Sequence, residues 1–215
     1  MNYSSSCIVY NLDLYKCNWH GWAQAFKELG LKHIKYICPT APITPVTLNG
    51  GMRMPSWFDI FGLGPDCEQD VAGIKKASDI LKNFISEEEK QGIPSNRIMV
   101  GGFSQGGAVS LYTAFTLEKP LAGIIGLSTW MPLHKDFDDE KMKKTNTDIP
   151  MLQCHGNADP LVPFHWGERT SHLIKKFSKC HKFKNYQNMA HSSCQEEMDD
   201  VKNFLQEHLS LDSKV

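Results

Sequence analysis

The sequence predicts an α/β fold in which a mainly parallel sheet is covered by helices on both faces. Two observations support this prediction. Short apolar runs rich in branched residues alternate with amphipathic stretches along the whole 215-residue chain. A Gly-x-Ser-x-Gly pattern at residues 102–106 also stands between one of these apolar runs and the start of a helix rich in small residues. No linker, internal repeat or low-complexity segment divides the chain, so we expect a single domain over residues 1–215.

The first third of the chain contains two predicted strands and one predicted helix. Residues 6–10 (SCIVY) predict a strand, residues 22–29 predict a helix, and residues 34–38 predict the next strand. Residues 48–66 (LNGGMRMPSWFDIFGLGPD) are rich in glycine and aromatic side chains. They contain too many breakers for a regular element, and we expect a long loop there.

A long amphipathic helix is predicted over residues 69–89. Its apolar side chains recur at helical spacing and are those of Ile74, Ala77, Ile80, Leu81, Phe84 and Ile85. The run RIMVG at residues 97–101 predicts a strand that leads into the serine pattern, and residues 123–128 predict the strand that follows it. Residues 135–144 mix acidic and basic side chains, so we expect a solvated surface loop or helix there.

The last third of the chain again alternates strands and helices. Residues 151–155 predict a buried strand, residues 167–177 a helix, and residues 183–186 the last short strand. Residues 196–209 predict the final helix. In an open parallel sheet, the loops at the carboxyl ends of the strands build the functional site.

The Gly-x-Ser-x-Gly pattern indicates a nucleophilic serine. Between a strand and a helix it is typical of the nucleophile elbow, where the serine lies on a strained turn with its hydroxyl exposed. Its glycines are needed because the neighbouring backbone packs close to them. The bare pattern also arises by chance, but the strand before it and the helix after it favour Ser104 as a nucleophile.

A nucleophilic serine needs a base and a group that orients this base. Asp159 follows the predicted strand at residues 151–155, and His191 lies in the loop after the predicted strand at residues 183–186. Ser104, Asp159 and His191 therefore occur in the order that enzymes with this elbow use, each in a loop after a strand.

Spacing alone leaves alternatives open for both partners of the serine. Asp159 also suits a turn before Pro160. His155 and His165 lie on either side of Asp159 in the sequence, and either could be the base. We expect His155 to pack at the strand end and His165 to open the next helix, which favours His191.

Charge and composition exclude some classes of function. The 23 basic and 24 acidic residues give a net charge of −1, which argues against a nucleic-acid partner held by bulk charge. The seven cysteines are odd in number and form no C-x-x-C pair, so we expect no zinc, and free thiols in the reducing cytoplasm.

No targeting or membrane signal is evident. The first residues lack the positive region of a signal peptide, and the longest apolar stretch, residues 121–131, is too short to span a bilayer. Asn2 stands where N-myristoylation requires glycine, so stable membrane anchoring is not predicted.

Several longer stretches carry a family resemblance. They are HIKYICP (33–39), MPSWFDI (54–60), GIPSNRI (92–98), GGFSQGG (101–107), LQCHG with DPLVP (152–163) and HSSC (191–194). In these stretches, and in their order, the chain resembles the acyl-protein thioesterases, which are small α/β hydrolases of the lysophospholipase and carboxylesterase type. The resemblance extends from about residue 20 to residue 208.

The resemblance implies the α/β-hydrolase fold and a role for each residue of the site. Ser104 is expected to be the nucleophile, His191 the base and Asp159 the orienting acid, and the backbone N–H of Gln105 is expected to be one donor of the oxyanion hole. The implied reaction is two-step acyl transfer, for which no metal and no organic cofactor is expected. The implied substrates are thioesters of S-palmitoylated proteins and lysophospholipid esters.

The resemblance fails near the N-terminus. The family carries a His-Gly-Leu-Gly-Asp loop that supplies the second oxyanion donor, whereas residues 11–19 of this chain (NLDLYKCNW) contain no glycine. Residues 1–19 therefore diverge from the family. Loss of one oxyanion donor lowers turnover by about a hundred- to a thousandfold. The alternative prediction is thus a catalytically impaired relative that binds lipid or acyl groups.

Two apolar regions bear on the substrate. Core packing is the ordinary role of such residues, but a long apolar loop at the catalytic edge also suits a groove for an acyl chain. The candidates for this groove are Trp57, Phe58, Phe61, Trp130 and Met131, with a purely structural role as the alternative for Trp57. A transient contact with a membrane surface is compatible with such substrates. The sequence predicts no particular oligomeric state.

Overall fold

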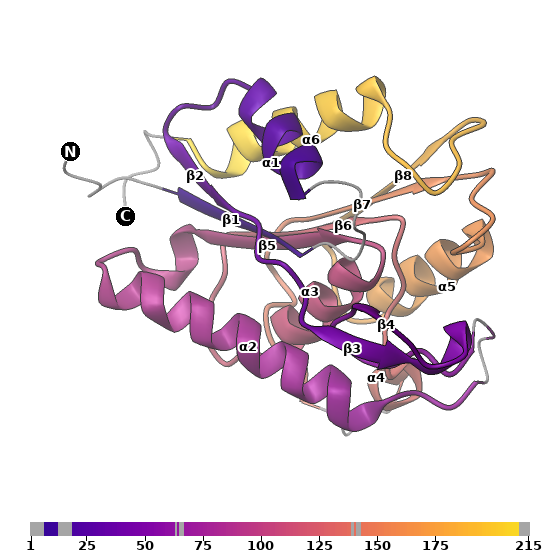
Figure 1. The fold of residues 1–215 in the computed structure, drawn as a ribbon. Helices are drawn as coiled ribbons and strands as arrows, with labels where there is room; N and C mark the ends of the chain where they lie inside the picture. Colours follow the sequence, from indigo (N-terminus) through magenta and orange to yellow (C-terminus); the bar gives the residue numbers. More distant parts are fainter. Residues whose placement is uncertain are drawn as a thin grey trace.

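The computed structural model describes residues 7–12, 19–62, 64, 67–138, 140 and 143–210. A parallel sheet of six strands in the order β2-β1-β5-β6-β7-β8 forms the centre of the molecule (Figure 1). Its strands are β1 (Cys7–Leu12), β2 (Ile34–Ile37), β5 (Ile98–Phe103), β6 (Gly123–Leu127), β7 (Met151–Gly156) and β8 (His181–Tyr186). Because all of these strands run in one direction, their carboxyl ends lie along one edge of the sheet.

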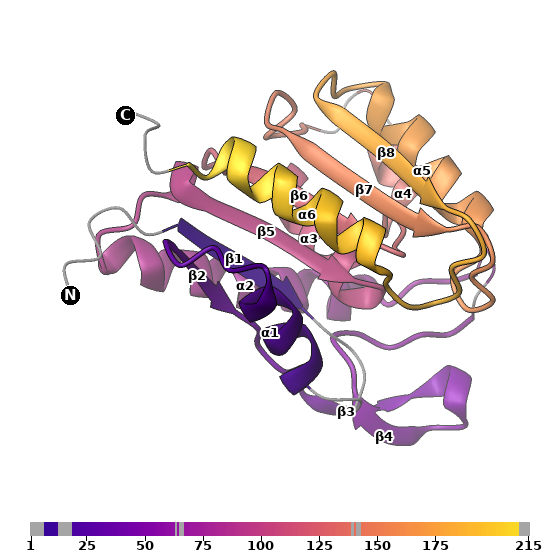
Figure 2. The same ribbon diagram turned by 90° about the horizontal axis from the view of Figure 1, so that it is seen from above.

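Helices cover both faces of the sheet, as the sequence predicts. Figures 1 and 2 show α1 and α6 on one face and α2, α3 and α5 on the other. The helices are α1 (Trp19–Glu28), α2 (Val71–Lys90), α3 (Gln105–Thr116), α4 (His134–Asp138), α5 (Phe164–Lys175) and α6 (Gln195–His208). Within the described part of the chain, no helix has the length and apolar character that crossing a bilayer requires.

Strand β5 shows why the sheet is covered on both sides. All six of its residues are buried. Ile98 and Val100 pack into the core beneath α2 and α3, whereas Met99 and Phe103 pack into the core beneath α1 and α6. A strand that is buried on both faces reads as a nearly continuous apolar run, which is how the sequence presents residues 97–101.

The prediction of a long irregular loop over residues 48–66 is wrong in its first half. Strands β3 (Ile43–Val46) and β4 (Met52–Pro55) pair in an antiparallel hairpin, with Val46 opposite Met52. A single 3-10 turn, Thr47–Asn49, and two glycines connect them. Gly50 and Gly51 have φ angles of 65° and 78°, so the glycines expected to break the structure form the turn of the hairpin instead.

Two further expectations are refined by the structure. The mixed-charge segment at residues 135–144 contains the short helix α4, but its Phe137 is 1% exposed and packs in the core rather than facing solvent. Helix α5 begins at Phe164, three residues earlier than predicted, because Pro163 occupies the N-cap position. The other predicted strands and helices are present to within a few residues.

Glu197 in the first turn of α6 provides a test of the packing between α6 and the sheet. Its side chain is fully buried, and neither carboxylate oxygen has a hydrogen-bond partner. Burial, and next the negative charge of Asp200, raise the pKa of Glu197 from 4.5 to about 8. A carboxyl whose pKa is higher in the folded than in the unfolded protein favours folding while it is protonated. This contribution to stability is complete at pH values below the unfolded pKa. This stabilisation is lost as the pH rises through the folded value.

We therefore predict that Glu197→Gln gains stability relative to the wild type as the pH rises from about 5 to about 9. The gain is expected to reach several kcal/mol, at about 1.4 kcal/mol per pKa unit. Thermal unfolding across this pH range measures the gain. The matched control is Glu196→Gln, because Glu196 is exposed in the same turn. Parallel pH profiles for both variants and the wild type would contradict the prediction.

Candidate active site

Ser104 lies on a strained turn between β5 and α3. Its φ of 54° and ψ of −123° are rare for a residue with a side chain. The turn is fixed from the neighbouring strand: the Ser104 N–H donates to the carbonyl of Leu127 at 2.8 Å, and the Thr129 hydroxyl donates to the Ser104 carbonyl at 2.7 Å. This geometry is that of the elbow predicted from the sequence.

Glycines leave room for this turn. A Cβ atom at Gly102 would lie 2.4 Å from the carbonyl carbon of Gly106, and one at Gly107 would lie 2.7 Å from the carbonyl oxygen of Gly102. Both distances are too short for any side chain. The close packing expected around the pattern is thus confirmed at Gly102, and Gly107, one residue beyond the pattern, is equally constrained.

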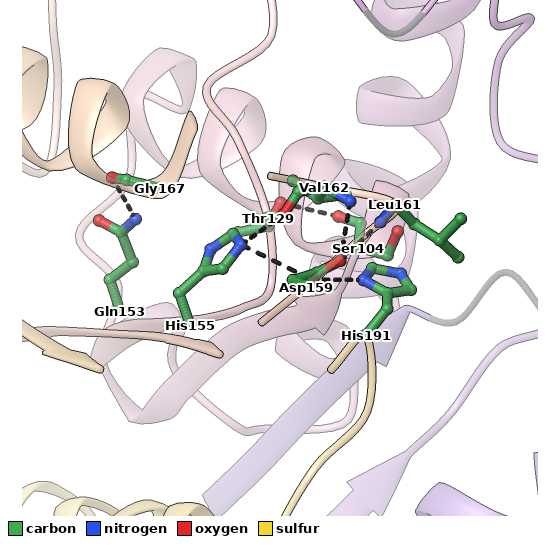
Figure 3. Close-up of polar contacts among 9 residues, drawn as sticks. All are labelled: Ser104, Thr129, Gln153, His155, Asp159, Leu161, Val162, Gly167 and His191. Carbon is green, nitrogen blue, oxygen red and sulfur yellow. Dashed lines mark hydrogen bonds and ion pairs between the residues drawn. The ribbon is translucent and has the colours of Figure 1, made fainter. Parts of the chain in front are cut away.

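Asp159 and His191 meet at the same edge of the sheet (Figure 3). Asp159 follows β7, His191 follows β8, and Nδ1 of His191 lies 2.7 Å from Oδ2 of Asp159. The other carboxylate oxygen, Oδ1, accepts hydrogen bonds of 2.9 Å from the backbone N–H groups of Leu161 and Val162. Since a carboxylate only accepts, Nδ1 of His191 is the donor, and Nε2 is left to accept a proton.

The hydrogen bonds keep Asp159 charged although its side chain is fully buried. Burial alone would raise its pKa, but the bonds from the His191 ring and from the two backbone amides outweigh burial and hold this pKa below its usual value. Asp159 is therefore a carboxylate at neutral pH, which suits a group that orients an imidazole.

The structure places the two alternative histidines differently. His165 lies exposed on α5, whose first turn it helps to form as predicted. His155 is fully buried in β7, with Nε2 2.8 Å from the carbonyl oxygen of Val162 and 3.6 Å from Oδ2 of Asp159. Figure 3 shows His155 and His191 on opposite sides of Asp159, with Ser104 on the side of His191. Of these three histidines, His191 is the one that lines a cleft together with Ser104.

Ser104 and His191 both line a cleft of about 330 Å³. The remaining lining residues are mostly apolar and are Val46, Leu48, Asn49, Met54, Ser56, Ile60, Trp130, Leu161 and Val162. The β3–β4 hairpin and the segment after it therefore form one wall of the cleft. A second, apolar cleft adjoins the first and shares Ile60, Trp130, Leu161 and Val162 with it.

The five residues proposed for an acyl groove fall into two groups. Trp130 lines both clefts, and Phe58 and Phe61 line the second one. Met131 is 2% exposed and borders a separate hollow beside α5, and Trp57 is 6% exposed in the core. The structure thus brings three of the five to the clefts and assigns Met131 and Trp57 mainly to packing.

Sequence reasoning missed the apolar residues that the hairpin contributes to the cleft. Val46 and Met54 come from its two strands, and Leu48 comes from its turn. The signal that could have revealed them was the turn pair Gly50-Gly51 between two short β-favouring runs.

Gln105 joins the elbow to this wall. Its buried side-chain amide accepts from the Trp57 N–H at 2.8 Å and donates to the Phe58 carbonyl at 2.7 Å. The position after the nucleophile thus fixes the segment that leads from the hairpin to the second cleft. Gln105 is the first residue of α3, so its backbone N–H has no hydrogen-bond partner within the helix.

Two sequence expectations concern the divergent N-terminal segment and metal binding. Residues 1–6 and 13–18, which make up most of the divergent segment 1–19, lie outside the described residues. Among the described residues, no group of three or more histidine, cysteine, aspartate or glutamate side chains is arranged to hold a metal ion.

Known proteins match the chain over most of its length. The family described as phospholipase/carboxylesterase matches residues 16–209. A protein of Neurospora crassa named acyl-protein thioesterase 1 is 40% identical over 200 residues, covering 88% of this chain and 82% of its own. One of the same name from Debaryomyces hansenii is 38% identical over 213 residues, covering 96% and 91%. The crystal structure of Zea mays acyl-protein thioesterase 2 superposes with a TM-score of 0.82 at 32% identity, covering 96% and 94%.

The Thr129 hydroxyl gives a test of how the elbow is held. We predict that Thr129→Val lowers kcat about tenfold, because the Ser104 turn loses a fixed contact, and costs about 1–2 kcal/mol of stability. Ester turnover and thermal unfolding measure the two effects. The control is Thr113→Val in α3, which removes an equally buried hydroxyl bonded to Ser78 at 2.9 Å. It should lower stability and leave kcat unchanged. Equal kcat values for both variants would contradict the prediction.

Proposed function

Because the chain belongs to the phospholipase/carboxylesterase family, and is therefore an α/β-fold hydrolase with a thioesterase or esterase function, we propose that it cleaves the thioester bonds of S-acylated proteins. Lysophospholipid esters are the second substrate class of the proposal. The reaction runs through a covalent acyl-enzyme on Ser104, and the chain acts as a single domain.

One observation carries this proposal. The buried bond from His191 Nδ1 to the Asp159 carboxylate leaves Nε2 free, and His191 lines the same cleft as Ser104. In the first step, Nε2 takes the proton of the Ser104 hydroxyl as its oxygen attacks the carbonyl carbon. The C–S or C–O bond then breaks, and the leaving group departs with the proton from His191. Water, deprotonated by His191, hydrolyses the acyl-serine in the second step.

The tetrahedral oxyanion needs hydrogen-bond donors, and we assign the backbone N–H of Gln105 as the first. It lies at the N-terminus of α3, where the helix dipole favours negative charge. The second donor is expected from the segment after β1. Leu12 at the end of β1 pairs with Gly102 of β5, so the chain leaves β1 beside the elbow. The residues that follow Leu12, 13–18, lie outside the described part of the chain.

The paired clefts suit an acyl chain. Trp130, Phe58 and Phe61 provide aromatic walls, and the hairpin adds Val46, Leu48 and Met54. A long hydrocarbon chain gains about 0.8 kcal/mol for each buried methylene group. The acyl chain would therefore lie along this apolar surface, with its carbonyl carbon at Ser104.

Exposed apolar side chains on the hairpin and at the clefts support a transient contact with a membrane surface. Ile43 and Met52 of the hairpin are 60% and 66% exposed, and Leu48, Phe61 and Leu161, which line the clefts, are exposed as well. Such a patch would meet the lipid surface in which an S-acyl chain resides. We place the protein in the cytoplasm, where the free thiols of Cys38, Cys67, Cys154, Cys180 and Cys194 would remain reduced.

The first test is turnover of a palmitoyl thioester by purified protein. Ser104→Ala and His191→Ala should each lower kcat by about 10⁴-fold or more, because the residues act as one unit. His165→Ala is the matched control, since His165 is exposed on α5, and it should retain full activity. Unchanged turnover by Ser104→Ala would refute the assignment of the nucleophile.

A fluorophosphonate probe separates this proposal from the binding alternative. Labelling of Ser104 together with turnover supports the hydrolase. Labelling with little turnover would indicate a competent Ser–His pair and a damaged oxyanion hole. A folded sample that is not labelled would favour a protein that only binds acyl groups.

Contact with a membrane surface has its own test. We predict that Ile43→Asp and Met52→Asp each lower binding to phospholipid vesicles about tenfold, because each removes an apolar contact with lipid. Turnover of a short-chain, water-soluble thioester should not change. The control is Val71→Asp, because Val71 is 45% exposed but lies at the start of α2, outside the hairpin. Equal vesicle binding by all three variants and the wild type would contradict the prediction.

A further inference from the structure

We propose that His155 is a positioning residue that fixes the loop carrying Asp159, and that it thereby sets the orientation of the carboxylate toward His191. This inference rests on the proposed triad of Ser104, His191 and Asp159. His155 itself does not line the substrate cleft, and Figure 3 shows Asp159 between His155 and His191.

The loop after β7 is held at its start by backbone contacts. The Asn157 N–H donates to the carbonyl of Tyr186 at 3.1 Å, and the Ala158 N–H donates to the carbonyl of Met189 at 3.1 Å. These bonds tie the start of the Asp159 loop to the loop that carries His191. The carboxylate then fixes the middle of the loop by accepting from two of the loop's own amides.

The end of the loop is held by His155. Its Nε2 lies 2.8 Å from the carbonyl oxygen of Val162, the residue whose N–H donates to Asp159. The same nitrogen lies 3.6 Å from Oδ2, the carboxylate oxygen that accepts from His191. If Val162 shifted, its N–H, which donates to the Asp159 carboxylate, would move with it. The carboxylate oxygen that accepts from His191 would then move as well.

The surroundings of His155 determine which of its ring nitrogens carries the proton. Both groups near Nε2 are acceptors, and Nδ1 is buried without a hydrogen-bond partner. The ring is thus neutral with the proton on Nε2, and burial supports this state by lowering its pKa. His155 acts as a fixed neutral donor.

Helix α5 packs closely against the ring of His155. A Cβ atom at Gly167 would lie 2.5 Å from Nδ1 of His155 and 3.0 Å from its Cγ. The carbonyl of Gly167 accepts from the buried side-chain amide of Gln153 at 2.9 Å, which fixes the helix against β7. The helix therefore lies too close to the ring for any side chain at position 167. Val162 contacts the ring at Nε2, and helix α5 packs against it at Nδ1.

A histidine that only filled the core could be replaced by an apolar residue at a cost in stability alone. The positioning role predicts more. His155→Leu keeps most of the volume and removes the donor, whereas His155→Gln supplies an N–H near the position of Nε2. We expect His155→Leu to lower kcat about 10- to 100-fold with KM changed less than about threefold. His155→Gln should recover kcat to within about fivefold of the wild type.

The pH profile is the second readout. The acidic limb of kcat/KM reports the pKa of the base in the free enzyme. A carboxylate that is less well aligned stabilises the imidazolium of His191 less, so the limb of His155→Leu should shift to lower pH by about half a unit. A change that affected packing alone would leave the limb in place.

Gly167→Ala keeps His155 and displaces its ring, so it tests the same role if His155→Leu folds poorly. It should lower kcat about tenfold with the same shift of the acidic limb. The control is His172→Leu, because His172 is exposed on α5, and it should behave as the wild type. Ser104→Ala in the same assay distinguishes the two proposals, because its unchanged turnover would refute the proposed function rather than the role of His155.

The outcomes are decisive in both directions. Loss of kcat in His155→Leu, recovery in His155→Gln and a shifted limb together support the proposal. Turnover of His155→Leu within about threefold of the wild type, no recovery by His155→Gln, or an unmoved acidic limb would each overturn it. If His155→Leu does not fold, full activity of Gly167→Ala overturns it as well.

Discussion

The positive φ angle at Ser104 is the constraint on which the rest of the site depends. A non-glycine residue in such a conformation costs about 1–3 kcal/mol, and the surrounding structure must hold it there. The close approach of the backbone at Gly102 and Gly107 allows the turn, and the contacts with Leu127 and Thr129 fix it from β6 and its loop. The position of the nucleophile at the cleft is therefore a property of two neighbouring strands and not of the serine pattern alone.

The same turn determines the wall of the cleft. Gln105 follows the serine, and its side-chain amide binds the backbone at Trp57 and Phe58. The elbow and the segment after the hairpin thus form one unit, so the acyl-binding surface and the nucleophile keep a fixed relation. A substitution of the Gln105 side chain would alter the cleft even though only its backbone N–H is assigned to the oxyanion.

The sequence predicted the parts of the site that depend on local pattern and strand order. Ser104, Asp159 and His191 each follow a predicted strand, and parallel strands bring such loops to one edge. The β3–β4 hairpin was missed because glycines that end a strand and glycines that turn a hairpin look alike in sequence. His155 was expected only to pack at the strand end. Its acceptor is the carbonyl of Val162, and a backbone acceptor leaves no trace in a sequence.

Two histidines beside one carboxylate differ in role because of their surroundings. His191 presents Nδ1 to Asp159 and keeps Nε2 for proton transfer, whereas His155 presents Nε2 to a carbonyl and has a bare Nδ1 against helix α5. Burial keeps His155 neutral, so it adds a donor without adding a positive charge that would weaken the attraction of Asp159 for the imidazolium of His191. Asp159 therefore lies between two histidine rings, and His191 is the one whose positive charge its carboxylate stabilises.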